Sequence, residues 1–95
     1  MYGFREDYDE NNRRIGEDVV DVDGNKYWVS TVDLGLDHSF GKGEPLYWET
    51  MIFPCDDNGG VTDWGELYCN RYPTKQAAVE GHAYAVEHCA EVINS

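Results

Sequence analysis

Histidine and carboxylate side chains that could share a catalytic site occur in three separate parts of this chain. Asp37 and His38 are adjacent in a glycine-rich segment, Glu49 follows in an apolar run, and His82 lies near the C-terminus. An acid–imidazole pair with a second carboxylate suits general acid–base catalysis or metal-assisted hydrolysis. A small metal-binding or hydrolytic enzyme is therefore one functional hypothesis, and it requires the loop, the strand and the helix to converge.

A second set of residues, His82, Cys89 and Cys69, has side chains that suit a metal ion. His82 and Cys89 are seven residues apart, which places them on one face of a helix, and Cys69 is positioned to approach them from a strand. The chain has no C-x-x-C, H-E-x-x-H or H-x-H motif to pre-organise the ligands. We therefore interpret His82 as a core histidine bonded to a carbonyl or a carboxylate, and we predict no metal and no cofactor.

The sequence also disfavours a cysteine nucleophile and a phosphate-binding loop. A reactive thiolate needs positive surroundings, whereas the net charge here is −12. The glycines at 35, 41 and 43 form neither G-x-G-x-x-G nor a P-loop. The Asp56-Asp57-Asn58-Gly59 stretch lacks the glutamate that ends an EF-hand loop. We expect no catalytic residue, and the three cysteines are predicted to be reduced thiols because their spacing is wide and irregular.

The acidic residues are the strongest global feature, with nineteen acids against seven bases. This charge repels phosphate backbones and anionic membranes, so we expect neither direct nucleic-acid binding nor membrane binding. One interpretation is that the acids only keep the protein in solution. The other is that they imitate phosphates and occupy a basic protein groove. Two clusters would form that surface: Glu17, Asp18, Asp21 and Asp23, and then Asp56, Asp57, Asp63 and Glu66.

The elements that position these residues follow from the hydrophobic pattern. Asp23-Gly24 is a type I′ turn signal between strands expected at about 18–22 and 26–34. Alternation in LYWETMIF, 46–53, predicts a third strand, with Trp48, Thr50 and Ile52 among the residues on its core face. WGELYCNRY, 64–72, predicts a fourth. Tyr47 and Phe53 fall on the opposite face of the third strand, where we expect them to be available to a partner.

The C-terminal segment has the composition of a helix, expected over about 75–93 and capped by Thr74. Gly81 within it indicates a close approach between helix and sheet. The fold class is therefore α+β: a four-stranded, mainly antiparallel sheet in the order β-β-β-β-α, with the helix packed on one face. Residues 1–16 are predicted to be a loosely ordered N-terminal arm, and 17–95 a single domain.

No signal peptide and no apolar run of membrane-spanning length is apparent, so we expect a cytoplasmic location. Of the aromatic residues, Trp28, Trp48, Trp64, Phe40 and Phe53 are expected to supply much of the buried area, because Leu, Ile and Val are few.

The order of motifs VSTVDLGLDHSFGKGEPL, ETMIF, RYPT and GH resembles a family of small uncharacterised proteins encoded by bacteriophages and prophages. The match runs over about 29–82. The family's recurring positions correspond here to Leu34, Gly35, Asp37, His38, Phe40, Gly41, Glu49, Thr50, Arg71, Tyr72, Thr74, Gly81 and His82. The resemblance implies no established activity. It implies a phage context inside a host bacterial cell, where many small acidic proteins bind and disable a host enzyme.

The leading functional hypothesis is therefore a non-enzymatic inhibitor of a host nucleic-acid-handling defence protein, of the anti-CRISPR or anti-restriction type. Its expected partner is a CRISPR effector or restriction enzyme with a basic groove. The alternatives are the enzyme or metal protein described above, and a phage structural or assembly protein that forms a homodimer through the uncovered face of the sheet.

Overall fold

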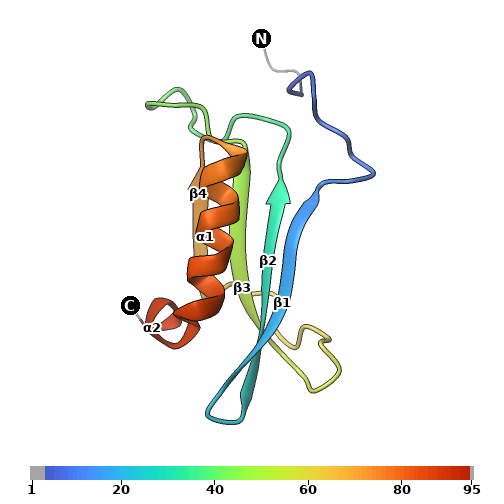
Figure 1. The fold of residues 1–95 in the computed structure, drawn as a ribbon, viewed down its shortest axis with the longest axis vertical. Coiled ribbons are helices and arrows are strands. Elements are labelled where there is room, and N and C mark those ends of the chain that lie inside the picture. The colour runs from blue at the N-terminus through green and yellow to red at the C-terminus, as the bar shows by residue number, and fades with distance from the viewer. Residues whose placement is uncertain (1–3, 95) are drawn as a thin grey trace.

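The computed structural model describes residues 4–94 and shows a four-stranded antiparallel sheet with helices packed on one face (Figure 1). The strands follow one another in the sheet in chain order, β1-β2-β3-β4. The elements are β1 (Arg14–Val22), β2 (Asn25–Asp33), β3 (Trp48–Cys55), β4 (Tyr68–Tyr72), α1 (Lys75–Glu87) and α2 (Cys89–Ile93). The predicted fold class is confirmed.

The hairpin between β1 and β2 turns at the predicted residues. Asp23 and Gly24 both have positive φ, 53° and 90°, as a type I′ turn requires. β1 begins at Arg14, earlier than the predicted 18, and a register shift between Arg14 and Gly16 lets Ile15 pack on the core. The strand therefore includes the last residues of the predicted arm. The pattern missed this start because the bulge interrupts the alternation.

β3 follows the predicted alternation on its core side. Trp48, Thr50 and Ile52 are buried beneath the helices. β3 extends to Cys55, and β4 is confined to its last five residues, so the expected strand start at 64 is wrong. Residues 56–67 instead form a loop, held to β3 by hydrogen bonds from Thr62 N to Pro54 O and from Leu67 N to Ile52 O.

The C-terminal helix begins as predicted, because the Thr74 hydroxyl accepts a 3.0 Å hydrogen bond from Ala77 N. Instead of one continuous helix, two helices meet at His88, whose φ of −113° and ψ of 30° interrupt the helical path. Gly81 has the predicted role. A Cβ there would lie 2.4 Å from the Tyr72 ring, so only glycine permits this approach.

Residues 4–13 contain no helix or strand, yet they contact the body of the protein. Arg5 N donates to Gly35 O at 2.7 Å, and the Phe4 and Tyr8 rings stack with centroids 4.8 Å apart. These rings lie against Gly35, where an added Cβ would be 2.6 Å from Phe4. Residues 1–3 of the predicted arm and residue 95 of the predicted domain lie outside the described residues.

Candidate protein-binding face

The sheet has one face covered by helices and one face without them (Figure 1). The strand register places Val19 beside Trp28, and Trp28 beside Phe53. These three alternate with core residues such as Val20 and Val29, so they project from the uncovered face. Trp64, from the loop after β3, joins them. We call Val19, Trp28, Phe53 and Trp64 the aromatic patch.

The aromatic patch is packed in its centre and open at its edge. The Trp64 ring contacts Phe53 and Trp28 edge-on, with centroid distances of 5.1 and 6.2 Å and interplanar angles of 65° and 90°. Trp28 and Phe53 lie 5.9 Å apart. Phe53 is only 7% exposed, whereas Trp64 is 68% exposed and Val19 is 49% exposed. Such a rigid, partly exposed group of rings resembles the anchor of a protein interface.

The expectation that Phe53 is available to a partner is therefore wrong, because Trp64 and Trp28 pack around it. Trp64 and Phe40 were expected in the core, and both are exposed, at 68% and 79%. Tyr47 belongs to another part of the molecule. Its ring lies 5.2 Å from the Arg5 guanidinium and 6.0 Å from the Trp48 ring, on the side of the sheet that the N-terminal segment contacts.

Most of the predicted acidic residues lie around the same end of the sheet as the aromatic patch. Glu17 and Asp21 project from β1 on the uncovered face, and Glu17 accepts a 2.8 Å hydrogen bond from Trp28 Nε1. The loop after β3 carries Asp56, Asp57, Asp63 and Glu66, all exposed. This loop and the β1–β2 turn both lie at the lower end of Figure 1. The loop after β3 also lies next to β1, because a Cβ added at Gly59 would be 3.6 Å from Val19.

Turn hydrogen bonds fix several of these carboxylates. Asp56 Oδ1 accepts from Asn58 N and Gly60 N, and Asp63 Oδ1 accepts from Gly65 N at 2.9 Å. Asp21 accepts from Lys26 Nζ at 2.6 Å and from Gly24 N at 2.8 Å, and these bonds hold the pKa of Asp21 below its usual value. The turn bonds hold these carboxylates in position. We call the exposed acids next to the aromatic patch its acidic border: Glu17, Asp21, Asp56, Asp57, Asp63 and Glu66.

Asp18 is the exception within the first cluster, because it projects toward α1. Its Oδ2 lies 2.7 Å from His82 Nε2. Asp18 therefore anchors the helix and does not contribute to the acidic border. Asp23 lies in the turn itself and is exposed.

The four residues of the enzyme hypothesis do not converge. Glu49 is on the uncovered face, where its Oε2 accepts from Arg71 Nε at 2.8 Å. His82 lies on the opposite side of the sheet, bonded to Thr31 and Asp18. His38 is in the loop after β2, with Nδ1 2.8 Å from Leu36 O, and Asp37 caps that loop by accepting from Leu46 N and Ser39 N.

The three predicted metal ligands, His82, Cys89 and Cys69, do not converge either. Cys69 projects from the uncovered face beside Glu49, while His82 and Cys89 lie on the helix side. Among residues 4–94, no group of three or more His, Cys, Asp or Glu side chains is arranged to hold a metal ion. The cysteines at 55, 69 and 89 are unpaired thiols, as predicted.

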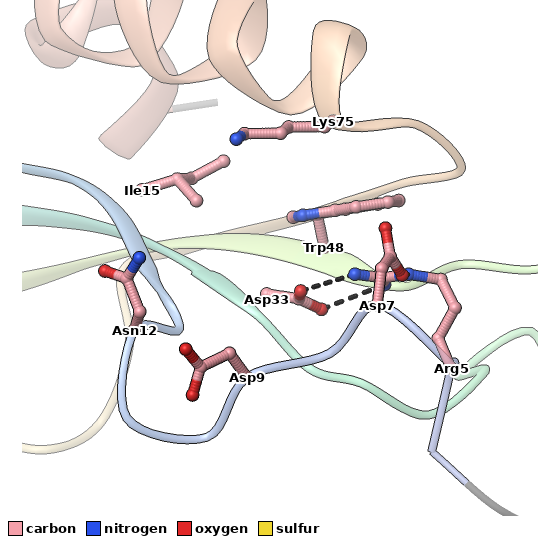
Figure 2. Close-up of a pocket in the computed structure, with 8 residues that line it drawn as sticks. All are labelled: Arg5, Asp7, Asp9, Asn12, Ile15, Asp33, Trp48 and Lys75. Carbon is pink, nitrogen blue, oxygen red and sulfur yellow. Dashed lines mark hydrogen bonds and ion pairs between the residues drawn. The ribbon is translucent and has the colours of Figure 1, made fainter.

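A polar cavity of about 230 Å³, which the sequence did not indicate, opens between the N-terminal segment and the start of α1 (Figure 2). Within it, the Arg5 guanidinium donates to both carboxylate oxygens of Asp33 and lies 4.3 Å from the Trp48 ring. Arg5 also pairs with Asp7. The lining residues are Arg5, Asp7, Asp9, Asn12, Ile15, Asp33, Trp48 and Lys75. The Arg5–Asp33 ion pair fastens residues 4–13 to β2.

Within residues 4–94, neither helix has the length and apolar character needed to cross a bilayer. No family model, curated protein or solved structure matches the chain.

Proposed function

We propose that this chain is a binding protein that docks through the aromatic patch and its acidic border onto a basic surface of a host protein. The single observation that supports this proposal is the position of Trp64. This tryptophan is 68% exposed, makes T-shaped contacts with Trp28 and Phe53, and belongs to a loop that carries Asp63 and Glu66. Exposed, rigid aromatic rings carry much of the binding free energy of protein interfaces.

The acidic border defines the chemistry of the proposed partner. Asp57, Asp63 and Glu66 are exposed on the loop after β3 and supply carboxylates for a partner. Glu17 and Asp21 on β1 extend the border, but they already pair with Arg14 and Lys26 of this chain. Carboxylates arranged in this way complement Lys and Arg side chains that normally contact phosphates. We therefore propose a nucleic-acid-handling partner, and the resemblance to phage proteins favours a host defence protein such as a CRISPR effector or a restriction enzyme. The mechanism is steric: the occupied groove no longer accepts nucleic acid.

The test is affinity capture from a bacterial lysate with three forms of the protein. These are the wild type, Asp57→Lys/Glu66→Lys at the acidic border, and Glu44→Lys/Glu87→Lys as a control. The control changes the net charge equally but alters exposed acids outside the aromatic patch and its border. The expected result is a nucleic-acid-binding protein captured by the wild type and by the control, lost with the border variant, and released by added DNA or RNA.

Two results would contradict the proposal. One is capture that the border variant retains at wild-type strength. The other is a captured protein that nucleic acid does not displace, which would place the contact outside a nucleic-acid groove.

A further inference from the structure

Two arginines of this chain are already bound in the same manner, each between a tryptophan ring and a carboxylate. Arg5 lies 4.3 Å from the centroid of the Trp48 ring, and its Nη1 and Nη2 donate to Asp33 at 3.0 and 2.5 Å (Figure 2). Arg14 lies 4.9 Å from the Trp28 ring, and its Nη1 donates to Glu17 Oε2 at 3.2 Å. A planar guanidinium stacks on an indole face while its N–H groups bond a carboxylate at the side.

Trp64 is a third tryptophan with carboxylate residues close to it in the chain, and no arginine of the described residues stacks on it. Its edge contacts with Trp28 and Phe53 fix the ring, and it is 68% exposed. Asp63 precedes it directly and uses only Oδ1 for the hydrogen bond from Gly65 N. Glu66 follows two residues later and is exposed. Among residues 4–94, the arginines that stack on aromatic rings are Arg5 and Arg14, and neither lies over Trp64.

We infer that Trp64, together with Asp63 and Glu66, receives an arginine side chain of the partner. This inference rests on the proposed function and specifies which basic residue the docking surface selects. The acidic border attracts lysine and arginine alike through its charge. The indole face distinguishes them, because a guanidinium loses little hydration on stacking whereas an ammonium is strongly hydrated.

The aromatic patch also explains why the partner's arginine would bind at Trp64 and not at Trp28. Arg14 stacks on Trp28, and Glu17 accepts hydrogen bonds from both Arg14 and Trp28 Nε1. An incoming guanidinium would have to displace Arg14 there. At Trp64 it meets an exposed ring.

The probes for the test are two fluorescent peptides of nine residues, one of arginine only and one of lysine only. Their dissociation constants are measured by fluorescence anisotropy at several salt concentrations. For the wild type we expect the arginine peptide to bind roughly 2- to 5-fold more tightly, which is the ratio that one exposed cation–π contact provides. Trp64→Ala should abolish this preference and leave lysine-peptide binding unchanged, while Trp64→Phe should retain part of it.

Tyr84→Ala is the matched control, since Tyr84 is 52% exposed on α1, away from the aromatic patch. It should keep the full preference. Equal affinity of the wild type for the two peptides would overturn the inference, and so would a preference that survives in Trp64→Ala. Circular dichroism of each variant shows whether the fold is intact, and Trp64→Phe tests the same ring position with the smaller change.

The two proposals fail in distinguishable ways. If the border variant loses a captured host protein but the wild type does not distinguish the peptides, the proposed function stands and the arginine site is wrong. If the arginine preference depends on Trp64 but no nucleic-acid-binding protein is captured, the site stands as a guanidinium receptor and the proposed function is wrong.

Discussion

Thr31 Oγ1 and His82 Nδ1 lie 2.7 Å apart and join the centre of the sheet to α1. The contact continues in both directions. His82 Nε2 lies 2.7 Å from Asp18 Oδ2, and Thr31 Oγ1 lies 2.6 Å from Thr50 Oγ1. Because a carboxylate only accepts, Nε2–H donates to Asp18; in the neutral ring Nδ1 then accepts from Thr31. The chain of bonds satisfies two threonine hydroxyls that are fully buried.

Replacing His82 with Ala should therefore destabilise the fold substantially. The change removes one of the two hydrogen-bond partners of the buried Thr31 hydroxyl, since Thr50 Oγ1 remains, and the lost ring leaves a cavity. Together these losses should cost about 1–3 kcal/mol. Urea unfolding followed by tryptophan fluorescence measures the free energy. Asp18→Ala is the comparison: the Asp18 side chain is 53% exposed, and its loss should cost less than about 1 kcal/mol.

A second comparison separates the unsatisfied hydroxyl from the cavity. In a Thr31→Val/Thr50→Val background, the buried hydroxyls are gone, so His82→Leu should cost less than it does in the wild type. An equal cost in the two backgrounds would show that the hydrogen-bond chain does not contribute to stability.

Gly81→Ala should destabilise the protein although alanine is the better helix former. The new Cβ would lie 2.4 Å from ring atoms of Tyr72, which is itself 7% exposed. The overlap forces the helix or the ring to move, at a cost of about 1–3 kcal/mol. In a Tyr72→Ala background the overlap disappears, and the same substitution should then stabilise by up to about 1 kcal/mol through helix propensity. Thermal unfolding of the wild type, Gly81→Ala, Tyr72→Ala and the double variant measures both the expected destabilisation and the expected stabilisation.

Lowering the pH should weaken the fold through Asp21 and Asp37. The pKa of Asp21 is lowered chiefly by the Lys26 ammonium and then by Gly24 N–H, and the pKa of Asp37 is lowered by hydrogen bonds from Leu46 N and Ser39 N. The unfolded chain therefore binds more protons at acidic pH than the folded chain. The stabilisation is complete above the ordinary carboxyl pKa and is lost as the pH falls through the folded values.

Urea midpoints from pH 7 to pH 3 measure this effect. Asp21→Asn/Asp37→Asn should be less stable at pH 7 and show a smaller decline toward pH 3. Glu87→Gln is the control, at an exposed position in the last turn of α1. A double variant whose midpoints fall as steeply as those of the wild type would contradict the assignment.

The features that could be predicted from the sequence are those that neighbouring residues determine. The Asp23-Gly24 turn, the Thr74 cap and the alternation of β3 each depend on a few residues close in the chain. Gly81 could be interpreted because glycine destabilises a helix interior, so its presence predicts a close contact there. The Tyr72 ring makes that contact. The early start of β1 was missed because the irregular register at Ile15 breaks the pattern that marks a strand.

The candidate site depends on contacts between distant residues, which the pattern could not supply. The sequence pattern predicts Trp64 in a strand and in the core, but residues 61–67 fold back along β3, and this places the Trp64 ring on Trp28 and Phe53. Glu49 and His82 lie on opposite faces of the sheet, and this depends on the face of the sheet on which α1 packs. No sequence pattern predicts the contacts of Arg5, because its partners Asp33 and Trp48 are far away in the sequence.

Cys69 should react slowly with alkylating agents although the residue is exposed. Partial burial of its thiol, together with the adjacent charge of Glu49, whose Oε2 accepts from Sγ at 3.5 Å, raises the pKa of Cys69 to about 11. The thiolate is the reactive form, so the rate with iodoacetamide should still be rising at pH 10, where an ordinary thiol has reached its plateau. Glu49→Gln removes a negative charge and should speed the reaction at pH 8, whereas Arg71→Gln removes a positive charge and should slow it. Peptide mapping by mass spectrometry separates Cys69 from Cys55 and Cys89, and a plateau by pH 9 in the wild type would contradict the raised pKa of Cys69.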